Sequence, residues 1–169
     1  MRDEHGVTMV EVLATMAITG IIGVVLSAAI VTGLRTTEQT RSKLTETQER
    51  QLTSTHFVAD VQSASEVATT STCGDGAVVV SLAWNEAGVA KEAAYRLRTV
   101  AGAQRLSRAL CSEGGAATVV DLARDLGAGS PVSVACAPSP CGAATERVVL
   151  SVTAASGRSF TATGVRRVA

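Results

Sequence analysis

The stretch Gly6-Val7-Thr8-Met9-Val10-Glu11-Val12-Leu13 opens an apolar run that continues to Leu34. Between Val7 and Leu34 the only charged side chain in the sequence is Glu11. At about 1.5 Å of rise per residue, these 28 residues predict a helix of roughly 42 Å, against roughly 30 Å for the hydrocarbon core of a bilayer. We therefore expect this run to cross a membrane.

The carboxylate of Glu11 is unusual in such a run. An ionised side chain near the end of a membrane helix costs about 2 kcal/mol or more, and less where it reaches the interface. Hydropathy alone leaves two interpretations open. Glu11 is either a side chain that extends to the lipid headgroups or a group with a function.

The residues around Glu11 resemble the cleavage and methylation motif of type IV prepilins and pseudopilins, whose common form is Gly-Phe-Thr-Leu-Ile-Glu. Here the motif reads Gly-Val-Thr-Met-Val-Glu, with Gly6, Thr8 and Glu11 at the family's spacing. The resemblance implies that prepilin peptidase cuts between Gly6 and Val7 and methylates the new amino group of Val7. It also implies that Thr8 and Glu11 belong to the assembly site, where Glu11 pairs with the terminal amine of a neighbouring subunit. Such a pair in a low dielectric would set the register of assembly.

The chain departs from the family pattern in three places. Val7 replaces the usual aromatic residue, and the leader 1–6 carries Asp3 and Glu4 beside Arg2. The apolar run also lacks the proline that many relatives carry midway along this helix.

Small and polar residues recur every fourth position within the apolar run. This spacing places them on a stripe that winds slowly round a helix, where they let neighbouring helices approach closely and exchange weak hydrogen bonds. Alanine, threonine and glycine are also common throughout the chain, so composition alone is the competing explanation. The stripe consists of Glu11, Thr15, Thr19, Gly23 and Ser27.

Two signals disagree about orientation. Arg2 precedes the run, whereas Arg35, Arg41 and Lys43 follow it, so the positive-inside rule places the C-terminal side in the cytoplasm. The resemblance implies the opposite, an inner-membrane protein that crosses once with its C-terminal domain outside and enters an extracellular fibre. Because four cysteines also favour an oxidising exterior, we expect the outside orientation.

The region 35–72 is polar and free of proline and glycine, so we expect the helix to continue out of the membrane and end near 68–72. Its sparse apolar stripe should lie on a sheet. The stripe consists of Leu44, Leu52, Phe57, Val58, Ala59 and Val61.

Beyond Cys73 the hydrophobic period changes to two. Alternation in 78–84, 95–98 and 106–110 predicts a three-stranded antiparallel meander packed on the helix, and strand-like patterning resumes at 132–134, 147–153 and 158–168. The segment 119–126 fits a strand or a short helix. The expected fold is α+β and pilin-like, with a long N-terminal helix packed on an antiparallel sheet.

We therefore expect four parts. They are a cleaved leader at 1–6, a transmembrane and assembly helix at 7–34, an extracytoplasmic amphipathic helix and linker at 35–72, and an antiparallel β domain at 73–169.

Four cysteines in an extracytoplasmic domain predict two disulfides. Cys136 and Cys141 enclose a short proline-containing loop and form the preferred local pair. That leaves Cys73 with Cys111, although a strict meander separates these two by about 25 Å. Cys73 with Cys136 is a rival pairing.

The residues indicate little chemistry. Balanced charge and few aromatic residues argue against a nucleic-acid binder. His56 has no second histidine or cysteine at ligand spacing, and Asp121 and Asp125 are by default two surface carboxylates. Nucleotide-binding and hydrolase motifs are absent from the sequence. We expect neither an enzyme nor a cofactor or metal site.

The favoured function is a minor pilin or pseudopilin, a structural subunit of a type IV pilus or of a pilus-like fibre for secretion or DNA uptake. Its expected partners are prepilin peptidase, other subunits, the membrane assembly platform and lipid. The alternative is a single-pass membrane protein whose β domain binds a ligand or partner outside the cell.

Overall fold

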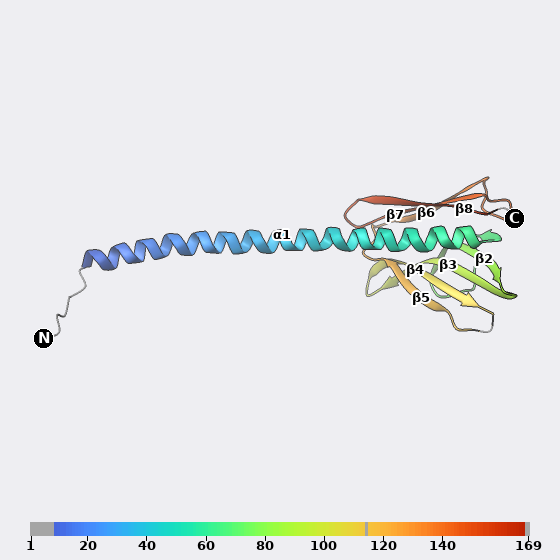
Figure 1. The fold of residues 1–169 in the computed structure, drawn as a ribbon, viewed down its shortest axis with the longest axis horizontal. Helices are drawn as coiled ribbons and strands as arrows, with labels where there is room; N and C mark the ends of the chain where they lie inside the picture. The colour runs from blue at the N-terminus through green and yellow to red at the C-terminus, as the bar shows by residue number, and fades with distance from the viewer. Residues whose placement is uncertain (1–8, 114, 168–169) are drawn as a thin grey trace. The chain divides into compact units, whose positions relative to one another are not determined.

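A computed structural model describes residues 9–113 and 115–167. Within them, one long helix, α1 (Met9–Ser63), precedes eight strands (Figure 1). The chain divides into two compact units, residues 1–45 and 46–169. The strands are β1 (Glu66–Ala68), β2 (Ala77–Glu86), β3 (Val89–Val100), β4 (Ala103–Ser112), β5 (Thr118–Ala123), β6 (Val132–Ala137), β7 (Arg147–Thr153) and β8 (Ser159–Val165).

The strands form two antiparallel sheets. The first has five strands in the order β1-β2-β3-β4-β5, and the second has three in the order β6-β7-β8. The predicted α+β organisation, a long apolar helix followed by antiparallel sheet, is confirmed. The expected three-stranded meander corresponds to β2, β3 and β4, and the undecided segment 119–126 overlaps most of strand β5.

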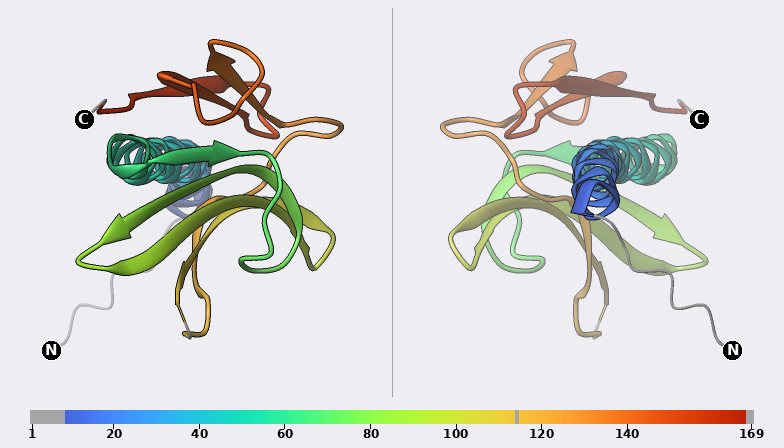
Figure 2. Two further views of the ribbon diagram at one scale, coloured as in Figure 1. Left: turned by 90° about the vertical axis from the view of Figure 1, so that its right-hand side faces the viewer. Right: turned by 90° about the vertical axis from the view of Figure 1, so that its left-hand side faces the viewer.

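The last turns of α1 lie between the two sheets, as both views in Figure 2 show. Phe57 and Val61 are fully buried and share one core with Leu82 of β2 and Leu150 of β7. Gly164 of β8 lies against this helix so closely that an added Cβ would be 2.5 Å from the Val61 Cβ. The absence of a side chain at position 164 therefore lets the second sheet approach the helix.

The buried face of α1 differs from the predicted stripe. Leu44 and Leu52 are exposed, by 59% and 39%, and the inward positions instead include Thr53 and Asp60. The spacing of Thr53, Phe57, Asp60, Val61 and Ala64 is helical, but two of these five buried residues are polar. The prediction from hydrophobicity was therefore wrong for Leu44 and Leu52, which do not belong to the buried face.

The helix also ends earlier than predicted, at Ser63 rather than near 68–72. The Ser65 amide donates to the Ala83 carbonyl, and Val67 is buried against β2, so residues 66–68 form a strand where a helix was expected. The guanidinium of Arg166 donates to the carbonyls of Ala64 and Ser65 just beyond the helix. Tertiary contacts thus overrule a sequence that would otherwise continue as helix.

Two tight hairpins organise the first sheet. Ala87 and Gly88 join β2 to β3, and Ala101 and Gly102 join β3 to β4, all four with positive φ. Positive φ at both central residues is the geometry whose twist matches that of a hairpin. The two hairpins therefore connect the three strands of the predicted meander.

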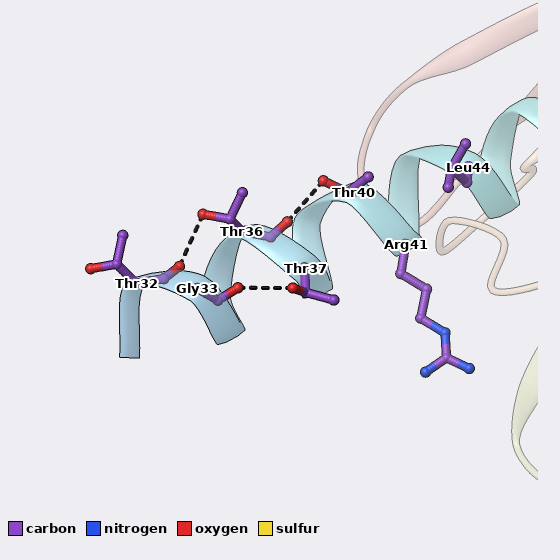
Figure 3. A pocket seen from close by; sticks show the side chains of 7 residues that line it. All are labelled: Thr32, Gly33, Thr36, Thr37, Thr40, Arg41 and Leu44. Carbon is purple, nitrogen blue, oxygen red and sulfur yellow. Dashed lines mark hydrogen bonds between the residues drawn. The ribbon is translucent and has the colours of Figure 1, made fainter. Parts of the chain in front are cut away.

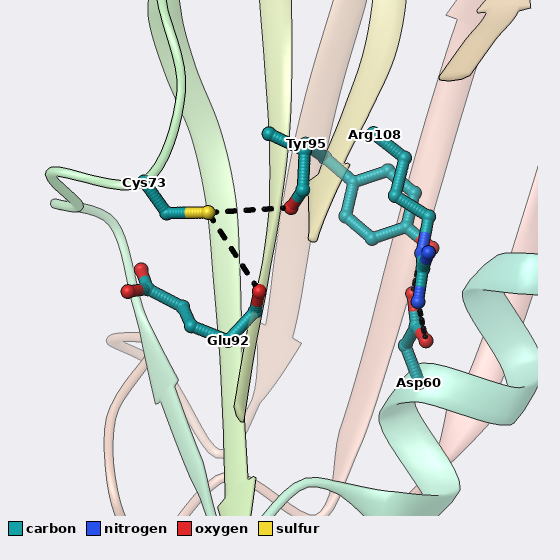
Figure 4. Close-up of polar contacts among 6 residues, drawn as sticks. Asp60, Cys73, Glu92, Tyr95 and Arg108 are labelled. Atoms are coloured by element: carbon teal, nitrogen blue, oxygen red, sulfur yellow. Dashed lines mark hydrogen bonds and ion pairs between the residues drawn. The ribbon is translucent and has the colours of Figure 1, made fainter. Parts of the chain in front are cut away.

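A buried ion pair ties α1 to the first sheet (Figure 4). Arg108 of β4 donates to both carboxylate oxygens of Asp60, at 2.6 and 2.7 Å, and the Tyr95 hydroxyl of β3 donates to the same carboxylate at 2.7 Å. Burial, followed by the charge of Asp60, raises the pKa of Tyr95 well above its ordinary value. The hydrogen bonds from Arg108 to Asp60 raise the pKa of Arg108 as well.

The structure pairs Cys73 with Cys111 and Cys136 with Cys141, with Cα–Cα separations of 5.9 and 5.1 Å. The separation of about 25 Å expected for Cys73 and Cys111 in a strict meander is wrong. The loop 69–76 does not lead straight into β2, because Arg96 donates to the carbonyls of Ser71 and Gly76. It crosses the outer face of the sheet, where Cys73 packs on Ala94 and Ala109.

Candidate functional site: the N-terminal helix

The first unit presents one uninterrupted apolar helical segment. By length and composition, Met9–Thr37 is able to cross a membrane, with 29 residues and a mean hydropathy of 2.2 in its most apolar window. None of the side chains described in 9–45 is buried. The apolar residues of this segment therefore contribute nothing to the core of the β domain.

Glu11 lies in the first turn of the described helix, among exposed apolar neighbours. Met9, Val10 and Leu13 beside it are exposed by 81%, 75% and 59%. The carboxylate is thus placed on an apolar surface near one end of the span. The predicted cleavage and methylation residues Gly6 and Val7, and the predicted assembly residue Thr8, lie outside the described residues.

The hydroxyl groups of the span bond within their own helix. Thr19 donates to the Thr15 carbonyl at 2.7 Å, and Ser27 donates to the Gly23 carbonyl at 2.8 Å. Such bonds satisfy a hydroxyl without a second helix. The residues of the predicted stripe lie on α1, and their contacts with neighbouring helices stay a prediction.

A second group of small residues lines an open hollow farther along the same helix (Figure 3). Thr36 and Thr40 each donate to the carbonyl four residues earlier, and Thr37 donates to the Gly33 carbonyl, all at 2.9 Å. The hollow is lined by a single helix, so it is an open depression of the surface rather than an enclosed cavity. Its lining consists of Thr32, Gly33, Thr36, Thr37, Thr40, Arg41 and Leu44.

The other polar residues considered from sequence do not join these groups. Asp121 pairs with Arg105 at 3.0 Å on the first sheet, and His56 lies half-buried on α1. No cluster of three or more histidine, cysteine or carboxylate groups suited to a metal occurs among the described residues. The Asp60, Tyr95 and Arg108 cluster was not predicted, because its members come from three separate elements.

The residues 1–30 match the model of the prokaryotic N-terminal methylation motif. The chain carries the type IV pilin signature. The match includes Gly6, Val7 and Glu11, and it confirms the resemblance seen in the sequence. Comparisons of the chain with curated proteins and with solved structures return no match.

The signature and the exposed apolar helix together describe a type IV pilin-like protein anchored in a membrane. The motif implies processing by prepilin peptidase and assembly with other pilin subunits. Proteins with this motif are structural rather than catalytic.

Proposed function

We propose that this pilin-like chain is a minor pilin or pseudopilin. It would be cut after Gly6, methylated on Val7, and assembled through α1 into a type IV pilus or a pilus-like secretion or DNA-uptake fibre. The observation that carries the proposal is the methylation motif at the start of a membrane-length helix whose described side chains are all exposed. Exposed apolar area of this extent needs lipid before assembly and other helices afterwards.

Glu11 would set the register between subunits. In a low dielectric its carboxylate is stabilised by a cation, and the amino group created by the cut after Gly6 would be the cation on a neighbouring subunit. Subunits in a wrong register would leave both charges without a partner. In the membrane we place the β domain outside, the side on which the two cysteine pairs would oxidise.

The first experiment tests processing. The full chain is expressed with prepilin peptidase, and its N-terminus is determined by intact mass and sequencing. We expect loss of residues 1–6 and the added mass of one methyl group on Val7, whereas Gly6→Val should keep its leader. A wild-type chain that retains its leader in the presence of active peptidase would contradict the proposal.

The second experiment tests assembly. Glu11→Gln removes the charge and keeps the shape, and we expect this variant, like Glu11→Val, to be processed and inserted but not to enter fibres. Thr15→Val is the matched control, because it keeps the shape of a side chain one turn away and removes a hydroxyl that donates to the Val12 carbonyl of the same helix. Equal amounts of Glu11→Gln and Thr15→Val in sheared fibres would refute the role of Glu11.

A further inference from the structure

Strand β8 is an open edge of the second sheet. It pairs with β7 on one side and ends the strand order β6-β7-β8 on the other. Edge strands expose unpaired backbone groups, and proteins commonly protect them with charges, prolines or short length. β8 has seven residues, Ser159–Val165, and contains neither a charge nor a proline.

The other described edges are better protected. β1 has only three residues, β5 contains Asp121 in an ion pair with Arg105, and β6 is bounded by Pro131 and Pro138. β8 is therefore the described edge most suited to accept another strand.

The hydrogen bonds at the two ends of the β7–β8 ladder identify which residues face outward. Arg166 N–H donates to the Glu146 carbonyl, and Ala154 N–H donates to the Arg158 carbonyl. Hydrogen-bonded pairs alternate with non-bonded pairs in an antiparallel ladder, so the even-numbered residues of β8 bond to β7. The N–H and C=O groups of Ser159, Thr161, Thr163 and Val165 therefore point to the open side.

The surrounding charge restricts the partner. Where β8 ends, Arg166 and Arg167 adjoin Arg147, which lies opposite Val165. The neighbouring carboxylates among the described residues include Glu146, whose carbonyl accepts from the Arg166 N–H, and Glu66, which directly follows the Ser65 carbonyl bound by Arg166. At the opposite end Arg158 is paired with Glu46 at 2.5 Å. A strand running antiparallel to β8 would begin at the end of the sheet where β8 ends. The guanidinium of Arg166 already donates to four carbonyls of this chain, so Arg147 and Arg167 are the side chains that would stabilise a carboxylate just before the first residue of the strand.

We propose that the open edge of β8 binds an extended, β-branched segment of another protein, antiparallel, with an acidic residue immediately before the segment. Backbone hydrogen bonds would provide the affinity, and the arginines would select the acidic start. A second β8 fits less well, because two-fold antiparallel pairing would bring Arg158 of each copy towards Arg166 and Arg167 of the other.

The test uses the full chain in detergent micelles and an acetylated peptide amide, Asp-Thr-Val-Thr-Val-Thr-Val. We expect binding to slow hydrogen exchange at the amides of Thr161 and Thr163, which should exchange rapidly in the free chain. A peptide with lysine in place of aspartate should bind more weakly, most clearly at low salt. Absence of protection at millimolar peptide would overturn the proposal.

Variants of the edge give a matched comparison. Thr161→Pro removes an outward N–H without touching a β7–β8 bond, and a proline is tolerated at such a position. Thr161→Val keeps the N–H and the shape. We expect peptide binding about tenfold weaker for Thr161→Pro, the effect of roughly one lost hydrogen bond, and unchanged for Thr161→Val. Equal affinities would overturn the proposal.

Thr163→Pro repeats the test should Thr161→Pro not fold, and the exchange measurement on the wild type needs no variant. Light scattering tests whether β8 pairs instead with the β8 of a second copy. A wild-type dimer that Thr161→Pro converts to monomer would show such pairing and overturn the proposal. None of these measurements depends on cleavage or fibre assembly, so their failure is distinct from failure of the proposed function.

Discussion

At the scale of single residues, we expect Asp60 to contribute strongly to the stability of the β domain. Asp60 is 5% exposed, and its carboxylate accepts three hydrogen bonds, two of them from Arg108. Removing one partner of a buried ion pair leaves a charge without compensation and costs about 3–5 kcal/mol. We expect Asp60→Asn to lower the free energy of unfolding by that amount, measured by denaturant titration of the chain in detergent.

The control for Asp60→Asn is Asp121→Asn. Its partner Arg105 and Asp121 itself retain 28% and 24% of their side-chain exposure, and such pairs are worth less than about 1 kcal/mol. Comparable losses for the two variants would show that burial of the Asp60 pair does not matter.

The absorbance of Tyr95 reports on the same cluster, because it is the only tyrosine in the sequence. Burial and the charge of Asp60 raise its pKa. The folded state thus holds the phenol protonated, so its stabilising effect is complete below the ordinary pKa of about 10 and stability falls as pH rises above that value. We expect phenolate absorbance to appear only as the protein unfolds at high pH, and Tyr95→Phe to reduce the loss of stability above that pH. A phenolate titration near the ordinary value in folded protein would contradict this.

At the scale of elements, Gly164 controls how β8 meets α1. An added Cβ would be 2.5 Å from the Val61 Cβ, which is buried, so either the strand or the helix must shift. We expect Gly164→Ala to cost about 1–3 kcal/mol. Gly142→Ala is the control, since its nearest neighbour is the Pro140 carbonyl oxygen at 4.0 Å and its φ is not positive. Thermal unfolding of both variants tests the contact, and an unchanged melting temperature for Gly164→Ala would refute it.

The two cysteine pairs close loops of very different length, with sequence separations of 38 and 5. By chain entropy the longer loop is worth about 4 kcal/mol and the shorter about 2 kcal/mol. We expect the double substitution of Cys73 and Cys111 by serine to destabilise the domain more than that of Cys136 and Cys141. Denaturant titration of the oxidised chains measures the difference, and the reverse order would contradict it.

At the scale of the whole molecule, the sequence predicts the elements better than their arrangement. The apolar run and the period-two strands are visible because each pattern repeats locally. The end of α1 at Ser63 depends on pairing of residues 66–68 with β2, and the path of loop 69–76 depends on Arg96, so neither follows from local pattern. The sequence does not show that Gly164 must lack a side chain, because this requirement comes from its contact with Val61 of α1.

The candidate site divides in the same way. The motif around Glu11 could be predicted because its spacing is fixed within six residues. The Asp60–Arg108 pair could not, since 48 residues separate its members and either alone reads as a surface charge. The open edge of β8 required the strand order, which no local pattern contains.

Because the buried side chains lie outside the membrane-length segment, we predict that residues 46–169 fold without it. Among the described residues the hydrophobic core begins at Phe57, the first fully buried side chain is Thr53, and no described side chain of 9–45 is buried. We expect this fragment to be soluble and to match the domain of the full chain in free energy of unfolding within about 0.5 kcal/mol, the usual effect of changes remote from the core. A fragment beginning at Ala59 is the control, because it lacks Thr53 and Phe57, both fully buried, and should not fold. A fragment 46–169 that unfolds or aggregates would show that the helix before Glu46 contributes to the stability of the domain.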